Sequence, residues 1–166
     1  MADALTVPHA VAAIVLGFAG LAKLRSPRVA ARAVGLAPLA IRAFATLELA
    51  LGAWALVAPA AVSSALMAML YAGFAGLTLA LSRAGAACGC FGEEGAPASP
   101  IQSLVSAALA LLCAACALAE PHALGWILRR SAGTATVLGL GTAGAVYGIV
   151  VAYSELPLLW RSWSPA

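Results

Sequence analysis

The chain contains four cysteines, arranged as two close pairs, and thiols are its most chemically specific side chains. Cys88 and Cys90 are separated by one glycine within the string ACGCFG at 87–92. A disulfide across one intervening residue closes a small, bent ring, and strained disulfides are readily reduced. The spacing therefore predicts a redox-active pair, with Cys88 and Cys90 as the reacting thiols.

Two alternatives remain open for this pair. Two thiolates also suit a soft metal ion such as copper(I), zinc or mercury, which would make Cys88 and Cys90 metal ligands, although no histidine lies nearby in the sequence. Passive packing at a helix end is the other alternative. The neighbouring glycines and the polar Glu93 and Glu94 are less typical of a packed helix end.

The composition shows which elements must position these thiols. Of the 166 residues, 64 % are hydrophobic and 9 % are charged, which excludes a water-soluble globule. Charged residues cluster and leave gaps long enough for helices of about 20 residues that cross a membrane. The gaps predict five membrane-spanning helices, near residues 6–24, 41–58, 62–82, 100–119 and 131–153.

The second cysteine pair, Cys113 and Cys116, falls late in the fourth predicted helix. The spacing places both on one stripe of that helix, among alanine and leucine neighbours. Because cysteine packs well as a small hydrophobic residue, we expect a packing role, with a secondary redox pair as the alternative. If both pairs react, electrons could pass across the membrane or to a quinone, the one candidate cofactor.

A lysine and a glutamate are predicted to lie near the first cysteine pair. Lys23 ends the first predicted helix on the same membrane face as Cys88, and Glu48 lies about two turns inside the second helix. A carboxylate inside a membrane is costly and usually paired, and a lysine can extend its stem to reach it. We expect a structural tie, a catalytic pair, or both. In the catalytic interpretation Lys23 favours a thiolate at Cys88 or Cys90, and Glu48 accepts or relays a proton.

The basic residues predict an orientation in the membrane. We call side A the membrane face that holds the connection between the first two helices and also Cys88 and Cys90. Seven basic residues lie on side A and two on the opposite side, which predicts that side A is cytoplasmic and the N-terminus outside. Those on side A are Lys23, Arg25, Arg28, Arg32, Arg42, Arg83 and Arg161, and the others are Arg129 and Arg130. We therefore attribute the net charge of +3 to the orientation in the membrane and to contact with anionic lipid. No nucleic-acid partner is predicted.

Two further expectations concern single residue types. His9 and His122 are expected to be surface residues on the face opposite Cys88. Gly144 and Gly148 form a GxxxG step in the fifth helix, which predicts a close contact with another helix.

Three strings in the chain resemble the methylamine utilisation protein MauE family, which is related to DoxX-like membrane proteins. They are GLAKL at 20–24 followed by Pro27, LEL at 47–49 followed by Gly52, and CGCFG at 88–92. The resemblance implies a thioredoxin-like partner and maturation of the disulfide-rich small subunit of methylamine dehydrogenase. It covers residues 1 to about 120, predicting a four-helix membrane domain at 1–120 and an additional helix with an interfacial tail at 121–166. Gln102 stands where the family often has an arginine.

The sequence therefore predicts an all-α, multi-pass protein of the inner membrane, a four-helix transmembrane bundle plus a fifth transmembrane helix. The expected activity is that of a thiol-disulfide oxidoreductase that exchanges disulfides with a thioredoxin-like protein. A non-catalytic subunit or anchor of a larger membrane redox complex and a soft-metal carrier are the alternatives.

Overall fold

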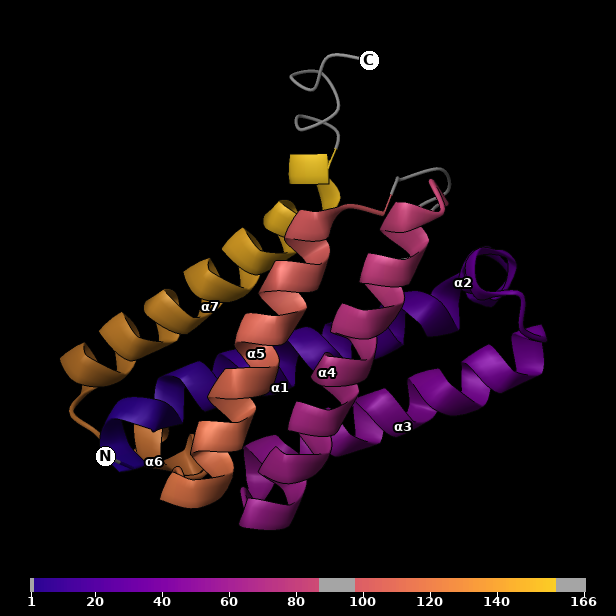
Figure 1. Cartoon of the computed structure of the whole chain (residues 1–166). Coiled ribbons are helices and arrows are strands. Elements are labelled where there is room, and N and C mark those ends of the chain that lie inside the picture. The colour runs from indigo at the N-terminus through magenta and orange to yellow at the C-terminus, as the bar shows by residue number, and fades with distance from the viewer. Residues whose placement is uncertain (1, 87–97, 158–166) are drawn as a thin grey trace.

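The computed structural model describes residues 2–86 and 98–157, and every regular element within these ranges is a helix. Figure 1 shows long helices joined by short connections. In chain order the helices are α1 (Ala2–Arg25), α2 (Pro27–Val34), α3 (Pro38–Val57), α4 (Ala61–Arg83), α5 (Pro100–Ala119), α6 (Leu124–Leu128) and α7 (Ala132–Ser154).

Five helices of the described residues, α1, α3, α4, α5 and α7, are long and apolar enough to cross a membrane. The shortest has 20 residues, which at ~1.5 Å per residue matches a hydrocarbon core of ~30 Å. The predicted all-α fold with five spans is confirmed. The largest difference at a helix end is at the start of α1, which begins at Ala2 rather than at residue 6.

Helix α1 lies at the centre of the molecule and is the most buried of the five spans. It packs against α3, α5 and α7, while α4 and α5 pack closely on each other and cross in front of α1 in Figure 1. Several alanines on α1 are fully buried and give the neighbouring helices room to approach. The main core cluster consists of Val11, Ala12, Ala13, Val15, Leu16, Leu51, Ala55, Met67, Tyr71, Leu109 and Cys113.

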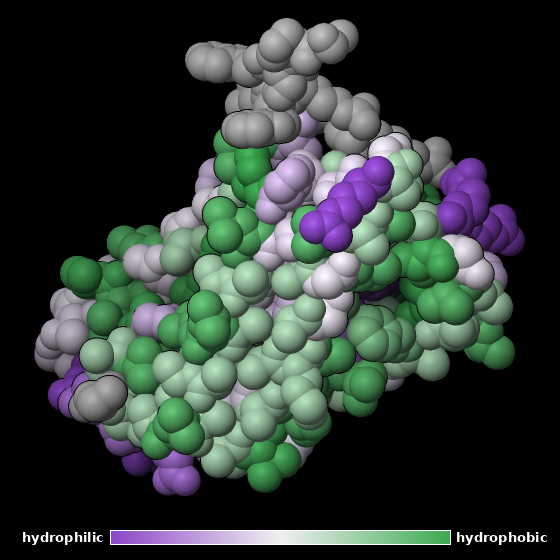
Figure 2. Space-filling model, viewed as in Figure 1, coloured by the Kyte–Doolittle hydropathy of each residue, from purple (hydrophilic) through white to green (hydrophobic). Residues whose placement is uncertain are grey.

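Large apolar side chains cover the outside of the bundle. Figure 2 shows hydrophobic residues over most of the visible face, with hydrophilic residues gathered toward its ends. A surface so extensively apolar is suited to lipid rather than to water. The chain is accordingly a multi-pass membrane protein. Exposed examples from each span are Phe18, Leu47, Met69, Leu111 and Leu140.

Proline and a capping residue define several helix starts. Pro27, Pro38 and Pro100 begin α2, α3 and α5, where the missing N–H of proline costs no helical hydrogen bond. At the start of α5 the backbone N–H of Ser99 donates to Oε1 of Gln102 at 3.0 Å. This contact fixes the Gln102 side chain at the side A end of α5.

Two short helices, α2 and α6, lie outside the predicted spans. Helix α2 lies in the charged connection between α1 and α3, where the charge pattern alone predicts no helix. It is amphipathic, because Ala30 and Ala31 pack against Ile41 while Arg28 and Arg32 are exposed. The charge clusters therefore indicate where the spans end but do not reveal short helices at the membrane surface.

The expected close contact at Gly144 and Gly148 is not made within this chain. A Cβ atom built at either glycine would meet nothing within 4 Å. The close helix contacts are instead at Gly20 and Gly52, between α1 and α3. A GxxxG spacing permits close approach but does not decide which helix has a neighbour on that face.

Candidate functional site

Lys23 and Glu48 form an ion pair inside the bundle. The Lys23 Nζ atom lies 2.8 Å from both Oε1 and Oε2 of Glu48. The Lys23 side chain is 9 % exposed and the Glu48 side chain is fully buried. The predicted tie between the first two spans is confirmed, while the catalytic role of Lys23 and Glu48 stays a prediction.

A glycine makes this contact between α1 and α3 possible. A Cβ at Gly20 would lie 2.7 Å from the carbonyl oxygen of Ala45 and 3.2 Å from Cβ of Glu48. One turn of α3 further on, a Cβ at Gly52 would lie 2.7 Å from the carbonyl oxygen of Ala13. Only glycine at both positions allows the two backbones to come this close, and the close approach brings Glu48 within reach of Lys23.

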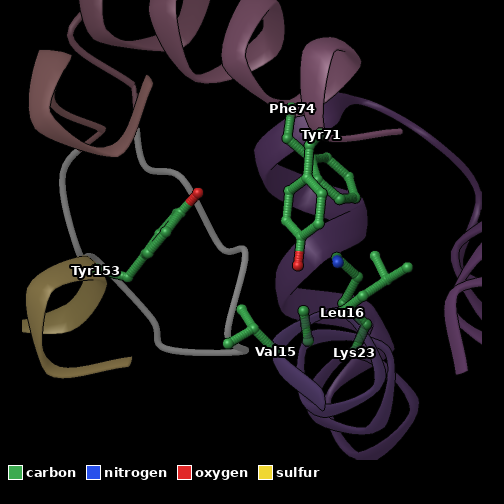
Figure 3. A pocket seen from close by; sticks show the side chains of 7 residues that line it. Val15, Leu16, Lys23, Tyr71, Phe74 and Tyr153 are labelled. Carbon is green, nitrogen blue, oxygen red and sulfur yellow. The ribbon is translucent and has the colours of Figure 1, made fainter. Parts of the chain in front are cut away.

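Aromatic side chains from α4 and α7 surround the lysine. The Lys23 Nζ atom lies 5.0 Å from the ring centroid of Phe74, within the range of a cation–π contact. Figure 3 shows a small cavity beside Lys23, with Tyr71 and Phe74 coming from α4 and Tyr153 from α7. The cavity measures about 20 Å³, and the surface that faces it is apolar.

Two tyrosines in this region were not among the predicted site residues. The Tyr71 hydroxyl donates to the carbonyl oxygen of Ala12 at 2.6 Å, and the Tyr153 hydroxyl is hydrogen-bonded to Ser106. A tyrosine inside a membrane-spanning helix is a signal, because its hydroxyl needs a partner there. The sequence alone does not identify that partner, since it lies on another helix.

Cys88 and Cys90 lie outside the described residues, so their predicted redox or metal-binding roles stay predictions. The ends of the connection that carries them are described. Helix α4 ends at Arg83, and the N–H of Ala98 donates to the carbonyl oxygen of Ala86 at 3.0 Å. The connection therefore leaves and returns at one place, on the side A ends of α4 and α5.

The ion pair lies deeper in the bundle than this place. Phe74, which contacts Lys23, comes nine residues before the last residue of α4. Nine residues correspond to about 13 Å along a helix. The charged pair thus lies deeper in the bundle than the described ends of the connection between α4 and α5.

Cys113 and Cys116 have the packed environment expected of them. Both are fully buried on the inner face of α5 and neither forms a disulfide. Cys113 belongs to the main core cluster. Their burial supports the packing role, and the secondary redox role stays a prediction.

The expectation for His9 is wrong. His9 is buried, and its Nε2 atom lies 3.1 Å from the hydroxyl oxygen of Ser64 on α4. The angular position of His9 on α1 turns it toward the bundle, where a buried serine satisfies it. His122 is exposed as expected, with Nε2 2.9 Å from Oδ1 of Asp3.

Across residues 2–86 and 98–157, no three His, Cys, Asp or Glu side chains come together as a metal site requires. The soft-metal alternative at Cys88 and Cys90 falls outside these residues. Within the described part of the chain, the Lys23–Glu48 pair is a buried pair of opposite charges.

Fold and site together define a multi-pass helical membrane protein whose first two spans are joined by a buried lysine–glutamate pair. Residues 1–120 match the family model described as methylamine utilisation protein MauE. Because this match covers more than two thirds of the 166 residues, the chain belongs to the MauE family. Comparisons with curated proteins and with solved structures gave no match. The ion pair lies within the matched residues, and α7 lies beyond them.

Proposed function

We propose that this protein is a membrane thiol-disulfide oxidoreductase in which Cys88 and Cys90 exchange a disulfide with a thioredoxin-like partner. The observation that carries the proposal is the burial of both Lys23 and Glu48. Two charges inside a membrane bundle are costly, and apolar residues of similar size would often hold two helices together as well. A buried charged pair in a chain that also carries a vicinal thiol pair supports a functional role.

The proposed reaction balances two electrons and two protons. A thiolate of Cys88 or Cys90 attacks the partner's disulfide, forming a mixed disulfide and releasing one partner thiolate. The second cysteine then attacks the mixed disulfide, which leaves a Cys88–Cys90 disulfide and releases the second partner thiolate. The two protons from the cysteines end on the partner thiols, and the reverse sequence oxidises the partner.

Lys23 and Glu48 would assist this exchange through charge. The ammonium of Lys23 would favour the thiolate form of a cysteine that approaches it, and the thiolate is the nucleophile. The carboxylate of Glu48 can accept a proton and return it. A disulfide-rich redox enzyme in need of maturation is the substrate class proposed for the partner. In the reverse direction, which oxidises the partner and leaves Cys88 and Cys90 as thiols, a quinone is the proposed acceptor that takes two electrons and two protons and restores the Cys88–Cys90 disulfide.

Orientation completes the proposal. The excess of basic residues supports an orientation with side A, and with it Cys88 and Cys90, at the cytoplasmic face of the inner membrane. On that face the thiols would meet a reducing compartment, so the pair would be a point at which reducing power enters the membrane protein.

Trapping of a mixed disulfide tests the exchange. The Cys113→Ala/Cys116→Ala variant retains only Cys88 and Cys90, at a packing cost of about 1–2 kcal/mol for the lost sulfurs. In lipid nanodiscs, this variant with either Cys88→Ser or Cys90→Ser is mixed with a thioredoxin that lacks its second cysteine and whose remaining cysteine is held as a mixed disulfide with thionitrobenzoate, which leaves as the thiolate when a cysteine of the membrane protein attacks. We expect a covalent adduct with one of the two single-cysteine chains.

The chain with both Cys88 and Cys90 replaced by serine is the matched control and should form no adduct. Failure of both single-cysteine chains to form an adduct contradicts the proposal. Retention of copper(I) or zinc by the two-cysteine chain, without an adduct, would assign the pair to metal binding instead.

A further inference from the structure

Helix α7 packs against the core cluster with the partly buried Val146 and Ile149, and places the buried Tyr153 near its end. Most of this helix is exposed to the surroundings of the bundle, and its buried residues are Thr142 and Tyr153. The Thr142 hydroxyl donates to the carbonyl oxygen of Leu138, within α7 itself. Tyr153 is therefore where the fifth span makes its polar contacts with the rest of the described bundle.

Tyr153 makes two hydrogen bonds with α5. Its carbonyl oxygen accepts from Nε2 of Gln102 at 2.8 Å, and its hydroxyl is bonded to Ser106. Gln102 and Ser106 are both buried. Because no water competes for these groups inside a membrane, the two contacts hold the end of α7 on α5.

Gln102 suits this attachment better than a basic residue would. Its amide accepts from the N–H of Ser99 through Oε1 and donates to Tyr153 through Nε2. An arginine at this position has donors alone and could not accept from Ser99. One side chain thus joins the start of α5 to the end of α7.

The Tyr153 ring also forms a wall of the cavity beside Lys23. The other walls come from α1 and α4 and include Tyr71 and Phe74, as Figure 3 shows. The volume of about 20 Å³ is close to the space that one water molecule needs, but an apolar cavity of this size stays dry. Removal of the Tyr153 ring would open one wall of this cavity.

We propose that Tyr153 is a positioning residue that closes the cavity beside the Lys23 ammonium and holds α7 over the Lys23–Glu48 pair. While Tyr153 is docked on Gln102 and Ser106, water is kept from the ammonium and Lys23 stays directed at Glu48. Release of Tyr153 admits water and solutes to the lysine. The fifth span then covers the Lys23–Glu48 pair. Any effect of this cover on thiol exchange rests on the proposed function.

The chain offers a selective probe, because Lys23 is its single lysine. A water-soluble amine-acylating ester is applied to the protein in nanodiscs, and acylation of the peptide that contains Lys23 is followed by mass spectrometry. We expect slow acylation in the unmodified chain and acylation about tenfold faster in Tyr153→Ala, the change expected when contacts of this strength are lost. Tyr153→Phe, which keeps the ring and the backbone contact with Gln102, should give a smaller increase.

Matched controls separate closure of the cavity from general stability. Tyr147 is exposed on the same helix, so Tyr147→Ala should acylate as slowly as the unmodified chain. Ile127→Ala removes a buried side chain from α6, at the other end of α7. This variant should lower the unfolding temperature without accelerating acylation of Lys23.

The proposal is overturned if Tyr153→Ala acylates no faster than Tyr147→Ala, or if Ile127→Ala accelerates it equally. Should Tyr153→Ala fail to fold, Ser106→Ala decides instead, because it removes the hydroxyl partner without changing α7. Unchanged acylation in Ser106→Ala and Tyr153→Phe then overturns the proposal. Acylation of Lys23 does not depend on Cys88 or Cys90. The acylation experiment can therefore be interpreted even if the protein does not exchange thiols with thioredoxin.

Discussion

The pairing of Lys23 with Glu48 concentrates two opposite charges where neither can be solvated. Both carboxylate oxygens of Glu48 lie 2.8 Å from the ammonium, and Phe74 covers the lysine from α4. Pairing offsets the cost of burial, so loss of one partner is more harmful than loss of both. Single and double substitutions of Lys23 and Glu48 therefore distinguish a structural role of the pair from a role in thiol exchange.

We predict opposite behaviour of stability and exchange in variants of this pair. Lys23→Met leaves the Glu48 carboxylate buried without its partner and should lower the free energy of unfolding by about 3–5 kcal/mol. Lys23→Met/Glu48→Leu removes both charges and should regain most of that loss. Denaturant unfolding in mixed micelles measures the stability, and trapping of the thioredoxin adduct measures exchange.

Exchange should stay slow in both variants, because neither retains the ammonium. Full exchange in the double variant would show that the ion pair only holds α1 and α3 together. A Lys23→Met chain as stable as the unmodified protein would contradict the energetic argument.

At the scale of the helices, the positions of the spans could be predicted from charge gaps, because a membrane excludes charge along a whole helix. The rotation of each helix could not. Whether His9 points outward or toward Ser64, and whether Gly20 or Gly144 faces a neighbouring helix, depends on packing between distant segments. The apolar composition does not show which face of a helix points into the core, because similar side chains face the core and the lipid.

The charged pair of the candidate site could be predicted from the sequence, but the contacts of Tyr153 could not. Lys23 stood out as a charge at the end of one apolar segment and Glu48 as a lone charge inside the next. Opposite charges inside a membrane are usually paired. Tyr153 lies on a helix beyond the family match and contacts Ser106, 47 residues earlier. No local spacing indicates such a contact.

Glycines at the contact between α1 and α3 give a prediction at this scale. Gly20→Ala would place a methyl group 2.7 Å from the carbonyl oxygen of Ala45, and overpacking of this kind costs about 1–3 kcal/mol. Gly144→Ala meets nothing within 4 Å and should leave the unfolding temperature unchanged or slightly raised. Thermal unfolding of the two variants in the same detergent compares them directly.

Gly52→Ala should resemble Gly20→Ala, because it also meets a backbone carbonyl oxygen at 2.7 Å. Equal stability of the Gly20 and Gly144 variants would mean that α1 and α3 are not in the close contact described.

At the scale of the whole molecule, orientation determines what the thiols can meet. Seven basic residues on side A against two on the other side predict that side A is cytoplasmic. A maturation role for secreted disulfide-rich enzymes would instead suit thiols that face outward, where disulfides persist. The charge distribution and the maturation role therefore predict opposite orientations. We follow the charge distribution, because it is a property of this chain's own sequence.

Labelling of intact cells decides the orientation. In the Cys113→Ala/Cys116→Ala chain, a membrane-impermeant maleimide should label Cys88 and Cys90 only after lysis. A chain that lacks all four native cysteines and carries Ser131→Cys, at the opposite end of α7 from Tyr153, is the control and should be labelled in intact cells. Labelling of Cys88 or Cys90 from outside would refute the cytoplasmic assignment and favour a role in maturation.

The most direct measurement of the central claim counts the thiols of Cys88 and Cys90 in two redox states. Membranes that contain the Cys113→Ala/Cys116→Ala chain are treated with a mild oxidant or with a reductant, quenched in acid, alkylated under denaturing conditions and weighed by intact-mass spectrometry. The account predicts two alkyl groups per reduced chain and none per oxidised chain, with the reduced count restored by thioredoxin and its reductase. Two alkyl groups in both states, or one or none after reduction, would contradict a redox-active Cys88–Cys90 pair.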